Sequence, residues 1–458
     1  MRRFISTFII ALTLLLAVAA APALAGPRTL AERPAVASAE ALTQQLKAVM
    51  ADQVMPILAM QAVVVKHGKV VYANSLGPRY VDNAAPANDL PVMNDTTYRI
   101  ASISKMVAAI GVMQQVEKGR IKLDADVSKY LGFRFRNPNF PGAKITARML
   151  LSHTSSLRDG DYYTFPATDK LSDYVTPAGA HFEGGARWQA PIAGTDASPG
   201  HYFSYQNLNY GVLATVLESV THQRFDRYMW AHVLRPLGCD ASYNVRAFSL
   251  ADLAKVGVLY RKMDDQGVWN TAGPWYPQVD DYRGVRPPAP AGATAYVPGT
   301  NATWESPQGG LRISALDLSR VMRLFMNGGS FRGHQLLEPA TVRLMFKPEW
   351  IYDAAANNGD TQGWCAEWGL GVQILKNDPD VGDRLLPTPD SPHWTGHLGE
   401  AYGMISNMLF DRRSGDGYVY YCAGMGADPF EHWSDYAPTF FTFDSTIVQA
   451  IFQNYFSK

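Results

Sequence analysis

Segments with the pattern of β-strands lie at both ends of the chain, and segments with the pattern of helices lie between them. Residues 60–65 and 70–73 flank the turn His67-Gly68 and read as a β-hairpin. Three strand-like stretches, rich in apolar and aromatic residues, follow near the other end, at 368–375, 401–410 and 418–423. We therefore predict an α+β fold, an α/β sandwich in which an antiparallel sheet assembled from both termini is flanked by helices, with a helical lobe inserted.

The middle of the chain carries apolar residues at helical spacing. The predicted helices span 39–55, 102–118, 146–151, 209–220, 225–234, 250–263, 315–328 and 445–456. The helix at 102–118 ends at Gly119, a favourable residue for a helix C-terminus, so Ser102 should lie in its first turn. We expect one domain over 26–458, with a sheet lobe at about 40–95 and 330–458 and a helical lobe at about 96–329. The cleft between the lobes is the expected site, and the long loop at 159–203 is expected to help shape it.

The first 25 residues resemble a secretory signal peptide. Arg2 and Arg3 precede an apolar run, and Ala23-Leu24-Ala25 forms a small-x-small end. We expect cleavage after Ala25 and export to the periplasm or the medium; an uncleaved membrane anchor is the alternative. No later stretch has the roughly 18 to 20 apolar residues of a membrane span.

Charge and cysteine content exclude several classes of partner. Lysine plus arginine and aspartate plus glutamate both number 41, so no basic surface for nucleic acid is expected. Cys239, Cys365 and Cys422 allow at most one disulfide and are too widely spaced for a zinc site. The nucleotide-binding and zinc-hydrolase motifs are absent, as is the G-x-S-x-G turn. We expect no cofactor, no metal, and a monomer acting on a small molecule.

The sequence Ser-x-x-Lys occurs once, at Ser102 and Lys105. Residues three apart share a face of a helix, so the lysine amine can reach the serine oxygen. A serine hydroxyl needs a neighbouring base, and lysine can be that base if burial lowers its pKa from about 10.4. The free N–H groups of the helix N-terminus could also stabilise an oxyanion. On its own the pattern is weak, because serine and lysine are common.

Other segments follow Ser102 in a fixed order. They are Leu150-Leu151-Ser152-His153-Thr154-Ser155-Ser156-Leu157, Tyr205-Gln206-Asn207, Ser306-Pro307-Gln308-Gly309-Gly310-Leu311 and His397-Leu398-Gly399. With them the chain resembles the class C β-lactamase-like serine hydrolases, a group with a β-lactamase/transpeptidase-like fold that includes D-alanyl-D-alanine carboxypeptidases, D-amino-acid peptidases and esterases. A second Tyr-x-Asn, at Tyr72-Ala73-Asn74, precedes the serine, and we interpret Tyr72 as an aromatic on a strand face.

The resemblance implies a role for each matching residue. Ser102 would attack a carbonyl, Lys105 would assist its deprotonation, and Tyr205 would relay a proton to the leaving group. Asn207 would bind substrate or orient Lys105, and His397 and Gly399 would line the substrate site. The backbone N–H groups of Ser102 and Glu400 would form the oxyanion hole. For His153 we expect only packing or hydrogen bonding, and for Trp364, Trp368 and Trp394 a place in the core or the pocket wall.

Two residues depart from the family pattern and leave the substrate open. Leu398 stands where β-lactamases and carboxypeptidases have a hydroxyl that helps hold the substrate carboxylate, and leucine cannot donate that hydrogen bond. Glu400 would repel a carboxylate if it faced the cleft. The expected reaction is cleavage of an ester or amide through an acyl-enzyme. The alternatives are action on β-lactams or peptidoglycan peptides by the same machinery, and a catalytically silent peptidoglycan-binding protein.

Overall fold

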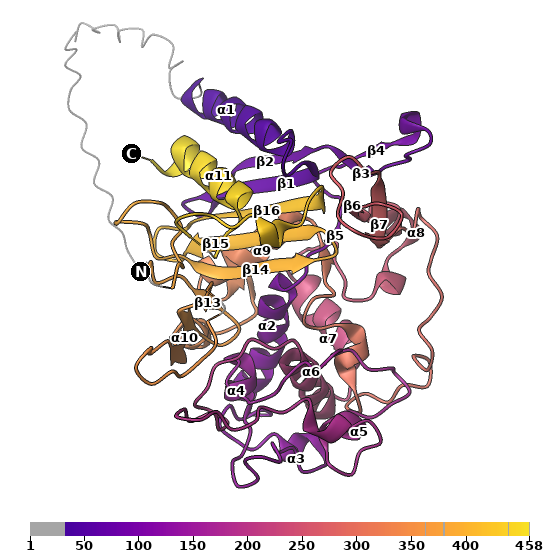
Figure 1. Cartoon of the computed structure of the whole chain (residues 1–458), viewed down its shortest axis with the longest axis vertical. Helices are drawn as coiled ribbons and strands as arrows, with labels where there is room; N and C mark the ends of the chain where they lie inside the picture. The colour runs from indigo at the N-terminus through magenta and orange to yellow at the C-terminus, as the bar shows by residue number, and fades with distance from the viewer. Residues whose placement is uncertain (1–32, 362, 379–380, 438, 458) are drawn as a thin grey trace, which may run out of the picture.

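A large sheet divides the protein into two layers of helices (Figure 1). The computed structural model describes residues 33–361, 363–378, 381–437 and 439–457, so the predicted signal peptide lies outside the described residues. Over these residues a ten-stranded sheet runs in the order β11-β12-β13-β14-β15-β16-β1-β2, and β6 and β7 extend it beside β16. All pairs are antiparallel except β16 with β6. The predicted α+β fold with an antiparallel sheet is confirmed.

The strands have the following bounds: β1 Ile57–Lys66, β2 Lys69–Leu76, β3 Pro78–Tyr80, β4 Leu90–Pro91, β5 Tyr98–Arg99, β6 Leu259–Lys262, β7 Trp275–Val279, β8 Arg312–Ile313, β9 Ser330–Phe331, β10 His334–Gln335, β11 Trp350–Ile351, β12 Glu367–Trp368, β13 Gln373–Ile374, β14 Thr395–Ala401, β15 Met404–Asp411 and β16 Asp416–Met425. The α-helices have the following bounds: α1 Arg33–Met50, α2 Ile103–Glu117, α3 Ser128–Leu131, α4 Ala147–Leu151, α5 Ser172–Val175, α6 Leu208–Thr221, α7 Phe225–Met229, α8 Leu250–Leu253, α9 Ala315–Met326, α10 Pro339–Met345 and α11 Thr442–Ile451. Single turns of 3₁₀-helix add Pro86–Asn88, Glu183–Gly185, Val245–Ala247, Ala302–Glu305 and Pro429–Glu431, and π-helical turns add Trp230–Leu234 and Phe452–Phe456.

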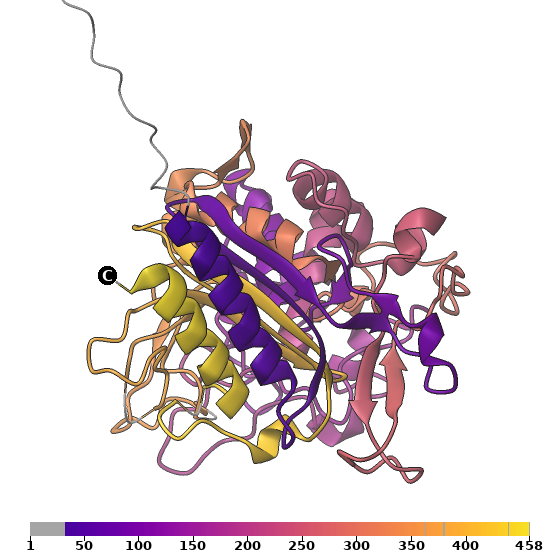
Figure 2. The ribbon, with the colours of Figure 1, turned by 90° about the horizontal axis from the view of Figure 1, so that it is seen from above.

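Strands from the two ends of the chain lie side by side in the sheet. Strand β1 pairs with β16 on one side and with β2 on the other. In the first pair, Met60 of β1 lies opposite Cys422 of β16. Helices α1 and α11 lie side by side on one face of the sheet (Figure 2). Leu42 and Leu46 of α1 are fully buried against this face with Ile447 and Ile451 of α11. Burial of this apolar surface holds both ends of the chain on the sheet.

The opposite face of the sheet packs against α2 and α9, and the helical region around α6 packs against α2 in turn. Helix α2 lies at the centre of this layer, and 13 of its 15 residues are buried. A helix that is apolar on nearly all sides must be surrounded by other elements, and α6 packs beside it in the same way. This central position fixes the N-terminus of α2 against the sheet.

The predicted helix at 250–263 is wrong. Only Leu250–Leu253 is helical, capped by the Ser249 hydroxyl, and Leu259–Lys262 forms strand β6. A Cβ on Gly257 would lie 2.1 Å from the ring of Tyr98. Only glycine therefore lets the backbone pass this close to Tyr98. Leu259 and Tyr260 are then buried in pairing with β7, an interaction between segments that the local apolar spacing does not reveal.

Other predicted elements differ in their bounds or are divided into shorter ones. The strand expected at 368–375 is two short strands, β12 and β13, joined by a turn. The last helix starts earlier, at Thr442, where the Asp444 side chain accepts a hydrogen bond from the Phe441 N–H, and it ends in the π-helical turn Phe452–Phe456. No helix within the described residues is long and apolar enough to cross a membrane. The three cysteines are buried and free, with no disulfide among them.

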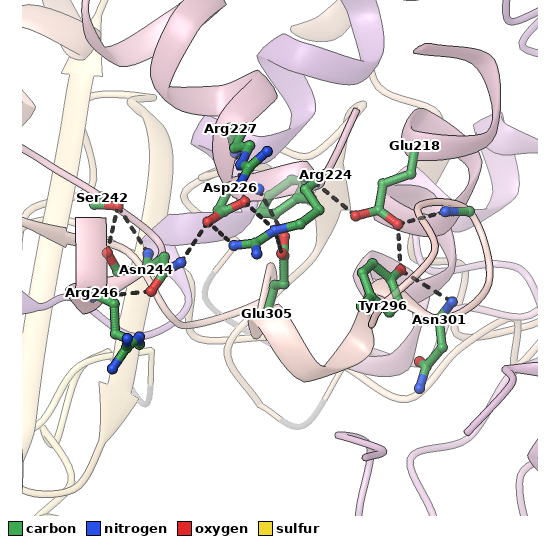
Figure 3. Close-up of polar contacts among 12 residues, drawn as sticks. Glu218, Arg224, Asp226, Arg227, Ser242, Asn244, Arg246, Tyr296, Asn301 and Glu305 are labelled. Atoms are coloured by element: carbon green, nitrogen blue, oxygen red, sulfur yellow. Dashed lines mark hydrogen bonds and ion pairs between the residues drawn. The ribbon is translucent and has the colours of Figure 1, made fainter. Parts of the chain in front are cut away.

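A buried polar network joins the end of α6 to α7 and to the turn at Ala302–Glu305 (Figure 3). Glu218 accepts hydrogen bonds from the Phe225 N–H and the Gly299 N–H, both at 2.8 Å. Arg224 forms an ion pair with Glu305 at 3.1 Å and also pairs with Asp226. Burial raises the pKa of Glu218 to about 7. These contacts anchor the loop after the Pro/Gly-rich stretch 285–299 to the helices.

Candidate active site

Ser102 lies at the N-terminus of α2, where the chain leaves β5 and turns into the helix. Ala101 adopts a φ of 52°, a left-handed conformation that is rare for a residue with a side chain. This turn presents Ser102 to a cavity of about 700 Å³ that also contacts Tyr205, Asn207 and His397. The cleft expected between sheet and helices is therefore present, and Ser102 lies in its wall.

Lys105 is fully buried one turn further along α2. Its Nζ lies 3.0 Å from Ser102 Oγ, 2.8 Å from Asn207 Oδ1 and 3.0 Å from the carbonyl oxygen of Gln308. Burial lowers the pKa of Lys105 to about 7, and the negative charge of Asp159 acts in the opposite direction. At neutral pH a substantial fraction of this amine is uncharged, which is the form that can accept a proton.

Asn207 is held in place by Asp159, a residue that the sequence did not single out. The Asp159 carboxylate accepts hydrogen bonds from the Asn207 N–H at 3.0 Å, from Asn207 Nδ2 at 2.9 Å and from the Leu208 N–H at 2.8 Å. It thereby caps α6 and fixes the amide of Asn207 with its oxygen toward Lys105. Gln308, whose carbonyl oxygen is another hydrogen-bond partner of Lys105, belongs to the glycine-containing segment noted in the sequence.

Tyr205 lies beside the amine of Lys105. Lys105 Nζ sits 4.8 Å from the centroid of the Tyr205 ring. Burial raises the pKa of Tyr205 well above its usual value, and its hydrogen bond with Ser102 partly offsets that rise. The Tyr205 ring also stacks on His153, with centroids 4.4 Å apart. The expected packing role of His153 is confirmed, since its Nδ1 also accepts a hydrogen bond from the Gln206 N–H at 3.1 Å.

Strand β14 brings His397 and Gly399 to the opposite wall of the cavity. His397 is buried edge-on against Trp368, and its Nδ1 bonds the Leu398 carbonyl at 2.6 Å. Burial and the nearby charge of Lys105 lower the pKa of His397 to about 3, so the ring is neutral. A Cβ on Gly399 would lie 2.8 Å from the Ile100 oxygen and 3.0 Å from the Ser102 nitrogen. Glycine is required here because the strand passes against the backbone of Ser102.

Glu400 faces the cavity, as the sequence allowed, but its charge has a partner. Its carboxylate pairs with Arg261 of β6 at 3.6 Å. Burial raises the pKa of Glu400, and Arg261 counteracts that rise. The cavity wall also contains Arg99, which donates to the Gly309 oxygen at 3.2 Å and lies over the Tyr402 ring. Glu400 is therefore a weaker barrier to an anionic substrate than its sequence position suggested.

The remaining aromatic residues have the places expected for them. Tyr72 lies on β2, in the layer under α1, and its hydroxyl is 2.9 Å from Thr43 Oγ1. Trp364 lines the cavity, Trp368 is buried behind Tyr205, and Trp394 packs in the core under α11. Within the described part of the chain, no group of histidine, cysteine and carboxylate side chains is placed to hold a metal ion.

This arrangement matches a known family. Residues 43–437 match the sequence model of the family described as beta-lactamase. The chain belongs to the beta-lactamase family. The match covers the sheet, the helical region and the residues around Ser102.

Individual relatives of this beta-lactamase family chain are distant. Protein flp of Staphylococcus aureus (strain N315) is 30% identical over 176 residues, which cover 38% of this chain and 32% of flp, so the chain spans about a third of that curated relative. The solved structure of EstCE1, a hydrolase with promiscuous acyltransferase activity, superposes with a TM-score of 0.59 at 19% identity, covering 91% of this chain and all of that one. The D-amino acid amidase from Ochrobactrum anthropi SV3 gives 0.59 at 17% identity, covering 92% and 99%. These likenesses confirm the β-lactamase/transpeptidase-like fold.

Proposed function

We propose that the protein is a serine hydrolase that cleaves an ester or amide through an acyl-enzyme on Ser102. The observation that carries the proposal is the environment of Lys105 Nζ. Asn207 Oδ1 and the Gln308 carbonyl can only accept hydrogen bonds, so a neutral Lys105 amine gives its two N–H groups to them. Its lone pair then points at Ser102 Oγ and can accept the hydroxyl proton.

The reaction divides into two acyl transfers. In the first, Ser102 Oγ forms a bond to the carbonyl carbon while its proton passes to Lys105 and on through Tyr205 to the leaving group, whose bond to the carbon breaks. In the second, water forms a bond to the ester carbon while its proton passes through Tyr205 to Lys105 and on to Ser102 Oγ, whose bond to the carbon breaks. The N–H groups of Ser102 and Glu400 are the proposed oxyanion hole, supported by the approach of Gly399 to the Ser102 nitrogen.

Covalent labelling tests this proposal directly. We expect a fluorophosphonate probe to add one adduct to the wild-type protein, with the modified peptide containing Ser102. The variant Ser102→Ala should lose the adduct, and the exposed control Ser414→Ala should keep it. A wild-type protein that gains no adduct at Ser102 and cleaves no activated ester would contradict the proposal and favour a silent binding protein.

A panel of candidate substrates, run on wild type and Ser102→Ala, tests the substrate class. We propose uncharged esters, or amides of D-amino acids, as substrates; of the structurally similar proteins, one is described as a hydrolase with promiscuous acyltransferase activity and one as a D-amino acid amidase. p-Nitrophenyl esters, D-amino-acid amides, D-Ala-D-Ala peptides and nitrocefin are compared in wild type and Ser102→Ala. Turnover of nitrocefin or D-Ala-D-Ala peptides above that of esters would favour the β-lactamase or carboxypeptidase alternative.

We also propose that the protein is exported and acts as a monomer. The sequence of residues 1–25 supports export, with cleavage after Ala25. N-terminal sequencing of protein secreted by its own signal should begin at Gly26, and light scattering should give the mass of one chain. An N-terminus still at Met1 in the membrane fraction would instead indicate the uncleaved anchor.

A further inference from the structure

The cavity at Ser102 continues around the edge of β14 to the other face of the sheet. Along β14, His397 and Gly399 face α2, and the alternate residues Leu398 and Glu400 face the layer of α11. Leu398 lies opposite Asn407 of β15 and packs with the apolar cluster under α11. Because β14 pairs with β13 only at its first two residues, its later edge is open to the cavity. The cavity is lined by residues from both faces.

The part of the cavity on the α11 side, here called the rear chamber, is lined by Leu398, Asn407, Phe430, Trp433, Phe441 and Asp444. Its three aromatic rings contact one another, with Trp433 and Phe441 centroids 4.6 Å apart and Phe430 and Phe441 5.5 Å apart. Phe430 and Trp433 remain 51% and 40% exposed. Contiguous exposed aromatic side chains over a cavity are typical of binding sites.

Asn407, which lines the rear chamber, also carries a buried polar atom without a partner. Asn407 is 1% exposed, and its Nδ2 donates to the Tyr420 hydroxyl at 3.1 Å. Tyr420 in turn donates to Asp444 at 2.7 Å. The Oδ1 of Asn407 has no hydrogen-bond partner among the described residues. A buried acceptor left unsatisfied is costly, and a ligand that donates a hydrogen bond there would remove the cost.

We infer that the rear chamber is a substrate subsite that takes an aromatic group attached to a hydrogen-bond donor, such as an amide N–H or a hydroxyl. The rings of Phe430, Trp433 and Phe441 would contact the aromatic group, and Asn407 Oδ1 would accept from the donor. The inference rests on the proposed function, because the occupant is an arm of the molecule that Ser102 attacks. It also gives Leu398 a role. Its side chain forms an apolar wall of the chamber, which the hydroxyl residue found at this position in β-lactamases and carboxypeptidases would not provide.

Esters that differ only in this arm test the inference. p-Nitrophenyl N-acetyl-phenylalaninate carries both a phenyl ring and an amide N–H, p-nitrophenyl 3-phenylpropanoate lacks the N–H, and p-nitrophenyl acetate lacks the arm. We expect Trp433→Ala to lower kcat/KM for the first ester roughly tenfold, through KM, and to change the acetate by less than about twofold. Trp230→Ala removes a tryptophan with similar exposure on the helical side and should change neither.

Asn407→Leu separates the donor from the ring. We expect it to remove the wild-type preference for the ester with the N–H over the phenylpropanoate, while the acetate is still cleaved. A Trp433→Ala variant that loses all three esters equally, or none, overturns the inference even if fluorophosphonate still labels Ser102. That labelling result keeps the failure of the subsite distinct from a failure of the hydrolase proposal.

Binding provides a readout independent of turnover. N-acetyl-phenylalanine amide is titrated into Ser102→Ala and into Ser102→Ala with Trp433→Ala, by calorimetry. We expect binding to the first protein and at least a tenfold weaker constant for the second. Equal binding, or none to either, contradicts the inference. If the second protein lost binding but Trp433→Ala had no effect on ester cleavage, the rear chamber would bind a molecule other than the substrate. That result would overturn the inference that the chamber is a substrate subsite.

Discussion

Among the residues that the structure describes, the amine of Lys105 has three polar partners and no carboxylate in direct contact. Buried lysines without an ion pair lose their charge more readily, because the ammonium ion gives up its hydration. Ser102 Oγ, Asn207 Oδ1 and the Gln308 carbonyl hold the amine in one orientation. The chemistry of the site thus depends on the protonation state of one side chain.

The pH dependence of activity should follow Lys105. The neutral amine is the active form and its pKa is about 7, so kcat/KM should rise about tenfold per pH unit below pH 7 and level off above it. Lys105→Arg keeps a positive charge at all accessible pH values, and we expect it to lower kcat by on the order of 10²- to 10⁴-fold. Ester hydrolysis from pH 5 to 9 measures both. A wild-type rate that falls as pH rises through 7 would exclude Lys105 as the base.

Asp159 should set the position of that pH midpoint. Its negative charge raises the pKa of Lys105 against the larger effect of burial, so Asp159→Asn should lower that pKa and move the midpoint to lower pH. Asp161→Asn removes a neighbouring charge that does not contribute to the pKa of Lys105, and its midpoint should stay at the wild-type value. Loss of activity in Asp159→Asn without a shifted midpoint would indicate that Asp159 acts only as a helix cap.

Local spacing accounts for what could be predicted of the site. Ser102 and Lys105 share a helix turn, so their proximity is encoded three residues apart, and the order of the later segments placed Tyr205 and His397 beside them. Asp159 had no such signal. Its role arises because a loop carries it to the N-terminus of α6, 48 residues away along the chain, and no local pattern marks a residue for that contact.

At the scale of elements, β14 joins the two walls of the site. Its alternation sends His397 toward the nucleophile and Leu398 into the rear chamber, and its glycine allows the strand to touch the start of α2. The family resemblance implied that His397 and Gly399 line the substrate site, but the nearest strand predicted from the residue pattern began only at 401. The sequence could not show that β14 contributes residues to the cavity from both faces of the sheet, because that depends on where the pairing of β14 with β13 stops.

Gly399→Ala should separate β14 from α2. The added methyl group would lie 2.4 Å from Ser406 Oγ and within 3.0 Å of two backbone atoms, so the strand must move and the proposed oxyanion hole opens. We expect kcat to fall on the order of 10²-fold, as for loss of an oxyanion donor. At Gly142 an added Cβ meets nothing within 4 Å, so Gly142→Ala is the control and should retain activity. Full activity in Gly399→Ala would mean that β14 does not supply the oxyanion hole.

For the whole molecule, the pattern of strands at both ends predicted the layout of the sheet, because both ends alternate or run apolar over strand lengths. The pattern failed at 250–263, where β6 joins the sheet beside β16 and pairs with β7. Val256, Val258 and Leu259 are compatible with either a helix or a strand, and only pairing with β7 and β16 decides between them. Residues that acquire their conformation from distant partners are the ones that a single sequence leaves open.

The network in Figure 3 should make global stability depend on pH. Burial raises the pKa of Glu218 from 4.5 to about 7, so between these values the folded state holds a proton that the unfolded state releases. The free energy of unfolding therefore falls as pH rises through this window, by at most about 3 kcal/mol. Glu218→Gln cannot ionise, and its stability relative to wild type should be higher at pH 8 than at pH 5.

Urea unfolding of wild type and Glu218→Gln at the two pH values measures this difference. Comparing each variant with wild type at the same pH cancels other groups that titrate in the window, including Asp444, whose pKa burial also raises to about 7. A stability difference between the two proteins that is the same at pH 5 and pH 8 would show that Glu218 is ionised in the folded protein throughout.

The pairing of β1 with β16 has a consequence for synthesis. Residues near 60 can pair with β16 only after residues near 420 have left the ribosome, so β1 stays unpaired on that side for most of translation. Helices α2 and α6 can form earlier, but the layer under α1 and α11 closes last. A chain whose translation stops before β16 would expose the apolar face of β1, which makes such fragments prone to aggregation and to proteolysis.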